Sequence, residues 1–297
     1  MNIVIFGAGA IGSLFGSMLS RNNDVLLIGR KTHVNAIKKN GLKIKGKTNT
    51  KIIINAETTV NKVDFSPDLV ILTVKAYDTL QAIKKAKKIV GKNTTFLSLQ
   101  NGLDNIEKIE KYVISKRIIA GTTTYSAYFN EPGIIEYTGN GTTIIGDLSG
   151  KKTNQVKEIS SVFNKVGIKT YVSNNIIKEI WFKAIINSSI NPITTLLNCK
   201  NGYLLENPIL EKLVERICKE STDIANAAGI DVNSKIMINK TKKVIRDTSE
   251  NYSSMLQSYM KGKKTEIDSI NGKFANIGKK YEKEKFINEL LVDSIKY

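Results

Sequence analysis

The stretch NIVIFGAGAIG, residues 2–12, decides the fold class of this chain. Residues 2–6 are mostly apolar and β-branched, which predicts a buried strand, and the small and apolar residues after them predict a helix. The glycines between the two are spaced G-x-G-x-x-G. In that setting the first glycine permits a tight turn, the second lets backbone N–H groups approach a pyrophosphate, and the third lets the helix pack on the strand.

This glycine pattern predicts a dinucleotide-binding unit, because the positive end of the helix would face the pyrophosphate. The competing interpretation is a packing turn built from small residues. The strand before the motif and the helix after it favour binding. We therefore expect the cofactor to contact the loop residues Gly7, Ala8, Gly9, Ala10, Ile11 and Gly12.

The end of the second expected strand, residues 24–28, indicates which dinucleotide is bound. Enzymes that use NAD place Asp or Glu about here, where it accepts a hydrogen bond from the ribose 2′-hydroxyl. This chain has Gly29, Arg30 and Lys31 instead. The pattern favours NADPH/NADP+, with Arg30 as the main ligand of the 2′-phosphate. A solvated basic loop without a ligand is the alternative.

The chain divides into two parts by its pattern of apolar residues. Residues 1–173 alternate short β-rich runs with amphipathic helical segments, which is typical of a mainly parallel sheet in a Rossmann-type domain. From residue 174 to 297 the pattern is long and helical. We therefore predict an α/β fold with an NADP-binding domain over 1–173 and an all-helical substrate and catalytic domain over 174–297.

Several finer expectations follow from turn and breaker residues. The runs 134–138 and 142–146 flank Gly139-Asn140-Gly141 and predict a hairpin at the sheet edge. A helix over 176–190 should end at Asn191, because proline disfavours helical geometry in the residue before it. Further helices are expected over 208–228, 236–262 and 266–281.

Composition excludes several classes of protein. The formal charge is +18, but only five of the 45 basic residues are arginine, whereas nucleic-acid readers favour that side chain. We therefore expect no nucleic-acid partner. No run approaches the ~18 apolar residues of a membrane span. The two cysteines lack metal-binding or disulfide spacing, so we expect no metal and a cytoplasmic location.

The single histidine, His33, lies among polar residues and is expected at the surface.

Polar residues that are suited to ligand binding or catalysis occur in both predicted domains. Lys75 and Asn101 follow strands of the sheet, where ligands bind in such folds. Lys183, Asn187 and Asn191 are spaced i, i+4, i+8 and share one face of a helix. A lysine in a partly dry cleft can act as a general acid. A lysine that snorkels to solvent fits the same spacing equally well.

The motifs in this order resemble the ketopantoate reductase (2-dehydropantoate 2-reductase) family over nearly the full chain. The segments that carry the resemblance are GAGAIG at 7–12, TVKAYD at 73–78, LQNGLDNIE at 99–107, AGTTTYSA at 120–127, WFKAIINSSINPITTLLNCKNG at 181–202, NYSSMLQ at 251–257 and TEIDSING at 265–272. The last three are the most specific. Two departures are Lys200 and the basic run 261–264, and neither removes a catalytic residue.

The resemblance implies a role for each matching position. Lys183 matches the catalytic lysine, which protonates the ketone oxygen. Glu266 matches a catalytic glutamate that orients cofactor and substrate. The substrate-binding positions, besides Lys183, are Asn187, Asn191, Asn201, Asn251 and Ser254. The cofactor-binding positions, besides the glycine loop, Arg30 and Glu266, are Lys75, Asn101 and Ala127.

The activity that the resemblance implies is NADPH-dependent reduction of ketopantoate to (R)-pantoate, on the route to pantothenate and coenzyme A. A related reductase of another 2-oxo acid and an NADP-sensing regulator without catalysis are the alternatives. Retention of Lys183 and Glu266 argues against the regulator. A homodimer is one assembly that the sequence allows.

Overall fold

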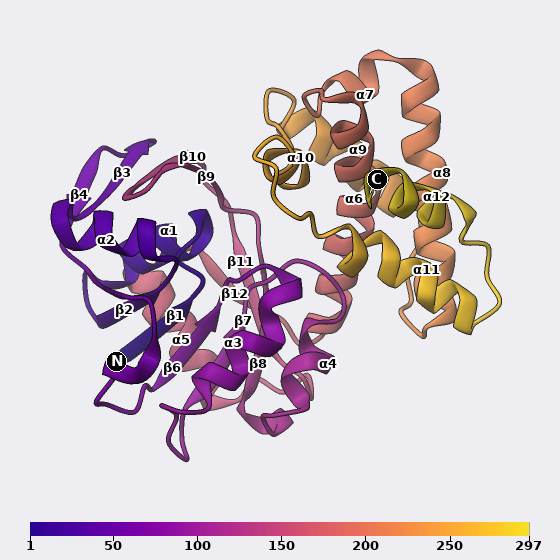
Figure 1. The fold of residues 1–297 in the computed structure, drawn as a ribbon. Helices are drawn as coiled ribbons and strands as arrows, with labels where there is room; N and C mark the ends of the chain where they lie inside the picture. The colour runs from indigo at the N-terminus through magenta and orange to yellow at the C-terminus, as the bar shows by residue number, and fades with distance from the viewer. Residues whose placement is uncertain (297) are drawn as a thin grey trace. The chain divides into compact units, whose positions relative to one another are not determined.

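The structure is a computed structural model that describes residues 1–296, and its chain forms two compact units (Figure 1). The αβ unit comprises Met1–Gln100 and Asn105–Ile177. The helical unit comprises Asn101–Asp104 and the chain from Lys178 onward. The short loop 101–104 thus belongs to the helical unit, although in the sequence it lies between elements of the αβ unit.

An eight-stranded sheet is the centre of the αβ unit, as the sequence predicts. Neighbouring strands are parallel except that β11 runs antiparallel to β8. In spatial order the strands are β12 (Thr170–Val172), β11 (Thr143–Asp147), β8 (Ile118–Thr123), β7 (Thr95–Ser98), β6 (Leu69–Leu72), β1 (Asn2–Phe6), β2 (Asp24–Ile28) and β5 (Asn55–Glu57). The order reverses at β1, so the carboxyl ends of β1 and β6 flank the crevice where such sheets bind ligands.

Helices cover both faces of this sheet, and its central strands β1 and β6 are accordingly almost entirely apolar and buried. Ile3 and Ile5 of β1 pack into one core cluster with Phe15, whereas Val4 and Phe6 pack into another with Phe96. The helices of the unit are α1 (Ala10–Leu19), α2 (Lys31–Asn40), α3 (Thr79–Ala86), α4 (Asn105–Glu110) and α5 (Asn154–Lys165), with the short 3₁₀ turns η1 (Val60–Lys62), η2 (Ala76–Asp78) and η3 (Ser115–Arg117).

A second, four-stranded sheet shows that the expected hairpin over 134–146 was wrong. Its order is β4 (Thr50–Ile52), β3 (Leu42–Gly46), β10 (Ile134–Gly139) and β9 (Ser126–Glu131). Strand β10 pairs with β3 and β9, whereas β11 pairs with β8 and β12. Gly141 carries the chain from one sheet to the other, passing so close to Tyr125 that a Cβ would lie 2.3 Å from the Tyr125 nitrogen.

His33 is buried, contrary to the expected surface position. Its ring is only 2% exposed, and its Nδ1 accepts a hydrogen bond from the Gly133 N–H at 2.9 Å. The neutral ring must then carry its proton on Nε2, which donates to Ser13 Oγ at 3.1 Å. His33 lies one turn before Ile37 on the buried face of α2. The helical period, rather than the polar neighbours in sequence, sets its environment.

Burial lowers the pKa of His33 from the ordinary value of 6.5 to about 4. Between these values the unfolded chain binds a proton that the folded chain does not, so the free energy of unfolding falls as the pH falls. We expect a loss of about 3 kcal/mol across this window from His33 alone. Urea unfolding of wild type and His33→Asn from pH 7 to pH 4 measures it. A wild-type advantage that does not shrink with falling pH would contradict the assignment.

The helical unit is built from helices throughout the described residues 178–296. They are α6 (Ile176–Leu197, which starts at the end of the αβ unit), α7 (Tyr203–Glu206), α8 (Pro208–Ala227), α9 (Ser234–Asp247), α10 (Ser254–Tyr259), η4 (Ile267–Ser269), α11 (Asn271–Lys280) and α12 (Phe286–Lys296). The predicted fold class is confirmed. Within residues 1–296, no helix is both long and apolar enough to cross a membrane.

Two expected helix boundaries were wrong. Helix α6 continues through Pro192 to Leu197 instead of ending at Asn191. The segment 236–262 is not one helix, because the chain turns between Asp247 and Ser254. Ser253 starts the second helix there: its Oγ accepts from the Leu256 N–H at 3.2 Å and receives a hydrogen bond from Thr194 Oγ1 at 2.8 Å. A side-chain cap supported from α6 thus overrides the continuous helical pattern.

Candidate active site

The glycine loop closes directly on the end of β1. Gly7 has a φ of +106°, and a Cβ on it would lie 2.5 Å from the Val74 nitrogen. A Cβ on Gly12 would lie 2.1 Å from the Gly7 carbonyl oxygen. Thr73 fixes the turn, since its hydroxyl donates to the Gly7 carbonyl at 2.9 Å. Gly7 and Gly12 are therefore required by the packing of the protein itself.

Gly9 differs from the other two glycines. It is the N-cap of α1 with a φ of −84°, and the nearest atom to an added Cβ is 3.9 Å away. As a glycine it offers no side-chain cap, and the first turn of the helix holds no acidic residue. The first N–H groups of a helix have no partner within the helix. A glycine that the protein's packing does not require, at a helix start without a side-chain cap, fits a pyrophosphate.

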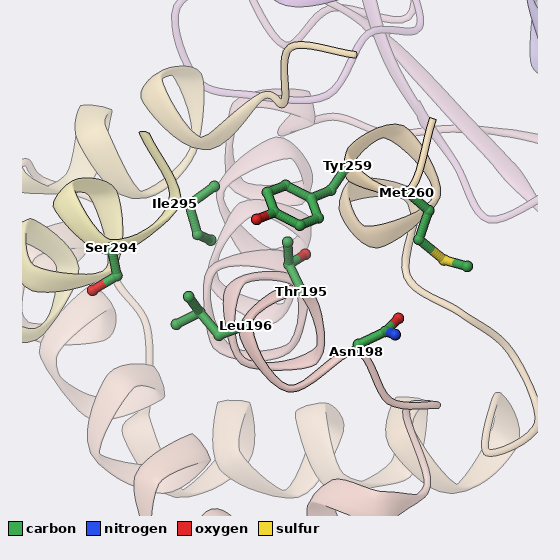
Figure 2. A pocket seen from close by; sticks show the side chains of 7 residues that line it. All are labelled: Thr195, Leu196, Asn198, Tyr259, Met260, Ser294 and Ile295. Carbon is green, nitrogen blue, oxygen red and sulfur yellow. The ribbon is translucent and has the colours of Figure 1, made fainter. Parts of the chain in front are cut away.

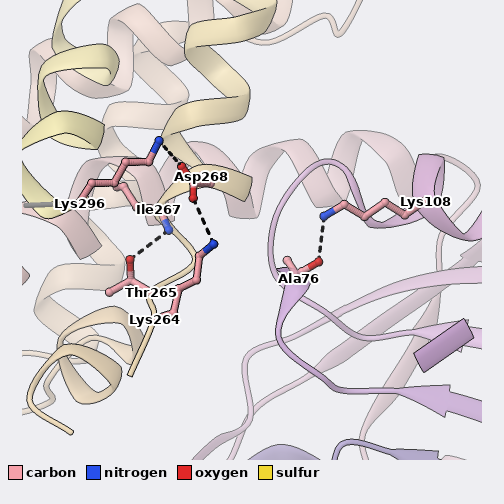
Figure 3. Close-up of polar contacts among 7 residues, drawn as sticks. All are labelled: Ala76, Lys108, Lys264, Thr265, Ile267, Asp268 and Lys296. Atoms are coloured by element: carbon pink, nitrogen blue, oxygen red, sulfur yellow. Dashed lines mark hydrogen bonds and ion pairs between the residues drawn. The ribbon is translucent and has the colours of Figure 1, made fainter. Parts of the chain in front are cut away.

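The other predicted cofactor residues of the αβ unit occupy three places. Arg30 follows β2 as the N-cap of α2 and is exposed. Lys75 precedes η2 beyond the end of β6, and this turn is fixed by Lys108, whose Nζ donates to the Ala76 carbonyl at 2.8 Å (Figure 3). Ala127 lies on β9, where it packs against the core that contains Ala8. Arg30 and Lys75 thus follow two strands that both neighbour β1.

In the helical unit, Asn101 and Glu266 lie together. The Asn101 Nδ2 donates to the Glu266 Oε2 at 3.5 Å, and the Glu266 side chain is buried. Gly102 lets the loop 101–104 pass close to the segment that follows Glu266. Its φ is +98°, and a Cβ at this position would lie 2.9 Å from Ser269. The Leu103 N–H donates to the Ser269 carbonyl at 3.0 Å. A neutral amide and a buried carboxylate therefore form one polar site.

The chain around Glu266 is held by a hydrogen bond and two ion pairs (Figure 3). Thr265 Oγ1 accepts from the Ile267 N–H at 3.4 Å, which shapes the turn into η4. Asp268 forms ion pairs with Lys296 at 2.7 Å and with Lys264 at 3.8 Å. One lysine of the basic run 261–264 is thus paired with a carboxylate of the same unit.

Helix α6 carries the predicted catalytic lysine. Lys183 and Asn187 are half-buried and Asn191 is buried, and the i, i+4, i+8 spacing places them along one helix face. The opposite side of the helix is fixed by apolar contacts, which include Ala184 and Ile185 in the core of the unit. A lysine ammonium and two amides in line offer donors for an anionic or carbonyl group.

Asn201 and Asn251 are joined through the backbone. The Asn201 N–H donates to the Asn251 carbonyl at 3.0 Å, and the Asn201 Nδ2 donates to Thr248 Oγ1 at 2.9 Å. The buried Asn201 Oδ1 has no partner among the described residues. A buried acceptor without a donor indicates a place for a ligand donor such as a hydroxyl. Ser254, the first residue of α10, and Asn251 are exposed.

A pocket of about 320 Å³ lies elsewhere in the helical unit (Figure 2). It opens beside the end of α6, where Asn198 has a φ of +49°. Its lining residues are Thr195, Leu196, Asn198, Tyr259, Met260, Ser294 and Ile295. They include none of the predicted site residues.

Two residues that support the site were missed in the sequence. Thr73 holds the glycine loop, and Ser253 positions the start of α10 next to Ser254. Thr73 is the first residue after β6 and Ser253 immediately precedes a helix, so a hydroxyl at an element end was the available signal.

Two family models and several curated relatives match this chain. The family model described as "Ketopantoate reductase PanE/ApbA" matches residues 3–150, and its C-terminal counterpart matches residues 175–297. A 2-dehydropantoate 2-reductase of Pyrococcus abyssi is 44% identical over 100% of this chain and 97% of its own length. One of Archaeoglobus fulgidus is 31% identical over 99% of this chain and 96% of its own.

Solved structures show the same fold. A ternary structure of D-mandelate dehydrogenase with NADH and anilino(oxo)acetate has a TM-score of 0.95 and 30% identity, covering 100% of this chain and 97% of that one. A ketopantoate reductase of Ralstonia eutropha has a TM-score of 0.91 and 26% identity, with the same coverage. The two family models cover both units and a full-length relative is 44% identical, so this chain belongs to the ketopantoate reductase family.

Proposed function

We propose that this chain reduces ketopantoate to (R)-pantoate with NADPH, a step that supplies pantothenate and coenzyme A synthesis. The observation that carries the proposal is full-length similarity to 2-dehydropantoate 2-reductases together with Lys183, Asn187 and Asn191 on one face of α6. Residues 1–173 would bind the NADP, and residues 174–297 would bind the substrate and supply the catalytic groups.

Lys183 is the proposed proton donor. When bound, the nicotinamide supplies a hydride to C2 of the 2-oxo acid. Lys183 offsets the charge that develops on the ketone oxygen and protonates it, a general-acid contribution of about 10²–10⁴-fold. No histidine competes for this role, because the only one, His33, is fully engaged with Ser13 and Gly133.

Neutral donors and acceptors would hold the substrate. Asn187, Asn191 and Asn201 offer amides for its carboxylate and hydroxyl, with Asn251 and Ser254 beside them. The unpartnered Oδ1 of Asn201 suits the hydroxyl, since a buried acceptor gains most from a donor. Glu266, aligned by Asn101, is proposed to orient cofactor and substrate together.

The αβ unit would hold NADPH through the glycine loop, Arg30, Lys75 and Ala127. The start of α1 provides N–H groups for the pyrophosphate, and Gly9 leaves room for it. Arg30 offers a guanidinium where NAD enzymes have a carboxylate. Its planar fork suits bidentate contact with the 2′-phosphate.

We expect Arg30→Glu to reverse the cofactor preference. The variant loses a charge-assisted contact with the 2′-phosphate and gains a repulsive carboxylate, so the KM for NADPH should rise about 10–100-fold. The KM for NADH should change little or fall. Initial rates with both cofactors at saturating ketopantoate measure the switch, with Lys31→Glu as the neighbouring control. An unchanged NADPH preference in Arg30→Glu would remove Arg30 from the assignment.

Reduction of another 2-oxo acid is the second candidate function. It is favoured by the similarity to D-mandelate dehydrogenase, whose solved complex holds NADH and an aryl oxo acid. A spectrophotometric screen of 2-oxo acids with NADPH and NADH distinguishes the two. Ketopantoate should be the fastest substrate. If a branched or aryl 2-oxo acid is reduced faster, the second function replaces the first.

The remaining proposals concern partners and location. We expect a cytoplasmic enzyme without a nucleic-acid partner, because its excess charge is carried mainly by lysines. A homodimer also stays a prediction. Phe286 and Leu290 support it, since they are 65% and 51% exposed and lie one turn apart on α12.

A further inference from the structure

Pro192 lies inside α6, yet the helix is not broken there. A proline lacks a backbone N–H, so the carbonyl four residues earlier loses its helical donor. In α6 that carbonyl belongs to Ser188. Ser188 is completely buried, so water does not supply the missing bond. An unpaired carbonyl at this depth would cost about 1–3 kcal/mol.

The missing donor comes from Asn271, at the start of α11. Its Nδ2 donates to the Ser188 carbonyl at 3.1 Å and to the Asn288 Oδ1 at 2.9 Å. The orientation of the amide is fixed, because a backbone carbonyl can only accept. The Asn271 Oδ1 is buried and has no partner among the described residues. The fold therefore uses the donor end of this side chain.

A chain of hydrogen bonds anchors Asn271 to the rest of the helical unit. The Asn288 Nδ2 donates to the buried carboxylate of Glu220 at 2.7 Å and to Ser221 Oγ at 3.2 Å. Glu220 also accepts from the Ile287 and Asn288 N–H groups at 3.0 and 2.8 Å, which caps the start of α12. Asn288 and Glu220 thus fix the side chain of Asn271, and its amide donates to the Ser188 carbonyl of α6.

We propose that Asn271 is a positioning residue for the active site, acting through the Ser188 carbonyl that Pro192 leaves without a donor. The predicted site residues lie on both sides of this carbonyl: Lys183 and Asn187 before it, and Asn191 after it. A helix bends where its hydrogen bonding is interrupted. The Asn271 amide fixes the backbone at Ser188, and with it the alignment of Asn191 with Lys183. The catalytic part of this inference rests on the proposed function.

The test restores the missing donor in a second way. Pro192→Ala supplies a backbone N–H that can bond Ser188 within the helix. We expect Asn271→Ala to lower the melting temperature and to lower kcat/KM for ketopantoate about tenfold, the loss of one buried hydrogen bond in energetic terms. Adding Pro192→Ala should bring kcat/KM back to within about threefold of wild type. A general loss of packing would not be repaired in this way.

Asn226→Ala is the matched control. Asn226 lies in the same unit, donates to the Val232 carbonyl at 2.9 Å and accepts from the Val232 N–H at 2.8 Å, and these bonds involve neither Asn271 nor α6. Its cost should be the same with proline or alanine at 192. Equal costs of Asn271→Ala in both backgrounds, like those of the control, would overturn the proposal.

Two further readouts keep the test decisive. If Asn271→Ala alone is insoluble, recovery of soluble protein on adding Pro192→Ala counts as rescue, and continued insolubility counts against the proposal. The coupling between the two substitutions in melting temperature needs no substrate. It therefore tests the contact with Ser188 even if ketopantoate is not reduced, and the wild-type assay tests the proposed function separately.

Discussion

Replacement of Lys183 by alanine should lower kcat for ketopantoate reduction by about 10²–10⁴-fold. The variant loses both the proton donor and the positive charge that stabilises the developing oxyanion. NADPH affinity should be unchanged, because the proposed cofactor ligands lie on other elements. Steady-state kinetics with ketopantoate, and fluorescence titration with NADPH, separate the two effects.

Two control variants sharpen this expectation. Lys178→Ala removes a lysine from the same helix, one that pairs with the exposed Asp231, and should leave kcat unchanged. Lys183→Arg keeps the charge but introduces a group that does not release its proton near neutral pH, so it should remain impaired. If Lys183→Ala kept normal turnover, another residue would have to be the acid.

Alanine substitutions at Gly9 and Gly12 should both abolish tight NADPH binding, but for different reasons. The protein has room for a Cβ at Gly9, and the φ of −84° at this position is one that alanine adopts without strain. Gly9→Ala should therefore keep the wild-type melting temperature and raise the Kd for NADPH about 10–100-fold, because the methyl group displaces the pyrophosphate from charge-assisted N–H contacts.

Gly12→Ala should destabilise the folded protein even in the absence of a ligand. Its Cβ would lie 2.1 Å from the Gly7 carbonyl oxygen and 2.5 Å from Thr73 Oγ1, so the turn must move. We expect a lower melting temperature as well as weak binding. Calorimetry of both variants, with and without NADPH, shows the difference. Normal NADPH binding by a stable Gly9→Ala would mean that the pyrophosphate lies elsewhere.

Local patterns were sufficient for most of the fold. The glycine motif and the apolar strand before it predict β1, α1 and the sheet. The tight turn and the packing of α1 on β1 depend on residues that lie close together in the sequence. In the second sheet, β10 was expected as a strand with the wrong partner, and β3, β4 and β9 were not identified in advance. Residues of β3 pair with residues of β10 that lie 91 positions later, and such pairing leaves little trace in the local pattern.

Long-range contacts also explain the errors at Pro192 and His33. A proline predicts the end of a helix if only local bonds are counted, but α6 continues because Asn271 supplies the missing donor. The polar neighbours of His33 in the sequence predict an exposed ring. The hydrogen bond that buries it comes from Gly133, which is 100 residues away in the sequence.

The candidate site was predictable where it depends on motif spacing. Lys183, Asn187 and Asn191 share a face because of helical period, and the structure keeps that face intact. The contact of Asn101 with Glu266 spans 165 residues, and spacing alone could not predict it. Thr73 was missed because its role depends on a strand that lies beside β1 only after folding.

The bond between Asn271 and Ser188 also constrains the order of events during synthesis. Helix α6 leaves the ribosome with a carbonyl that no nearby residue can satisfy, and its donor is 83 residues further along the chain. The amide that supplies it is anchored by Asn288 of α12, which is itself held by Glu220. The helix with the proposed catalytic lysine therefore reaches its final shape only after Asn271 has been translated, and a product truncated before Asn271 would lack the donor.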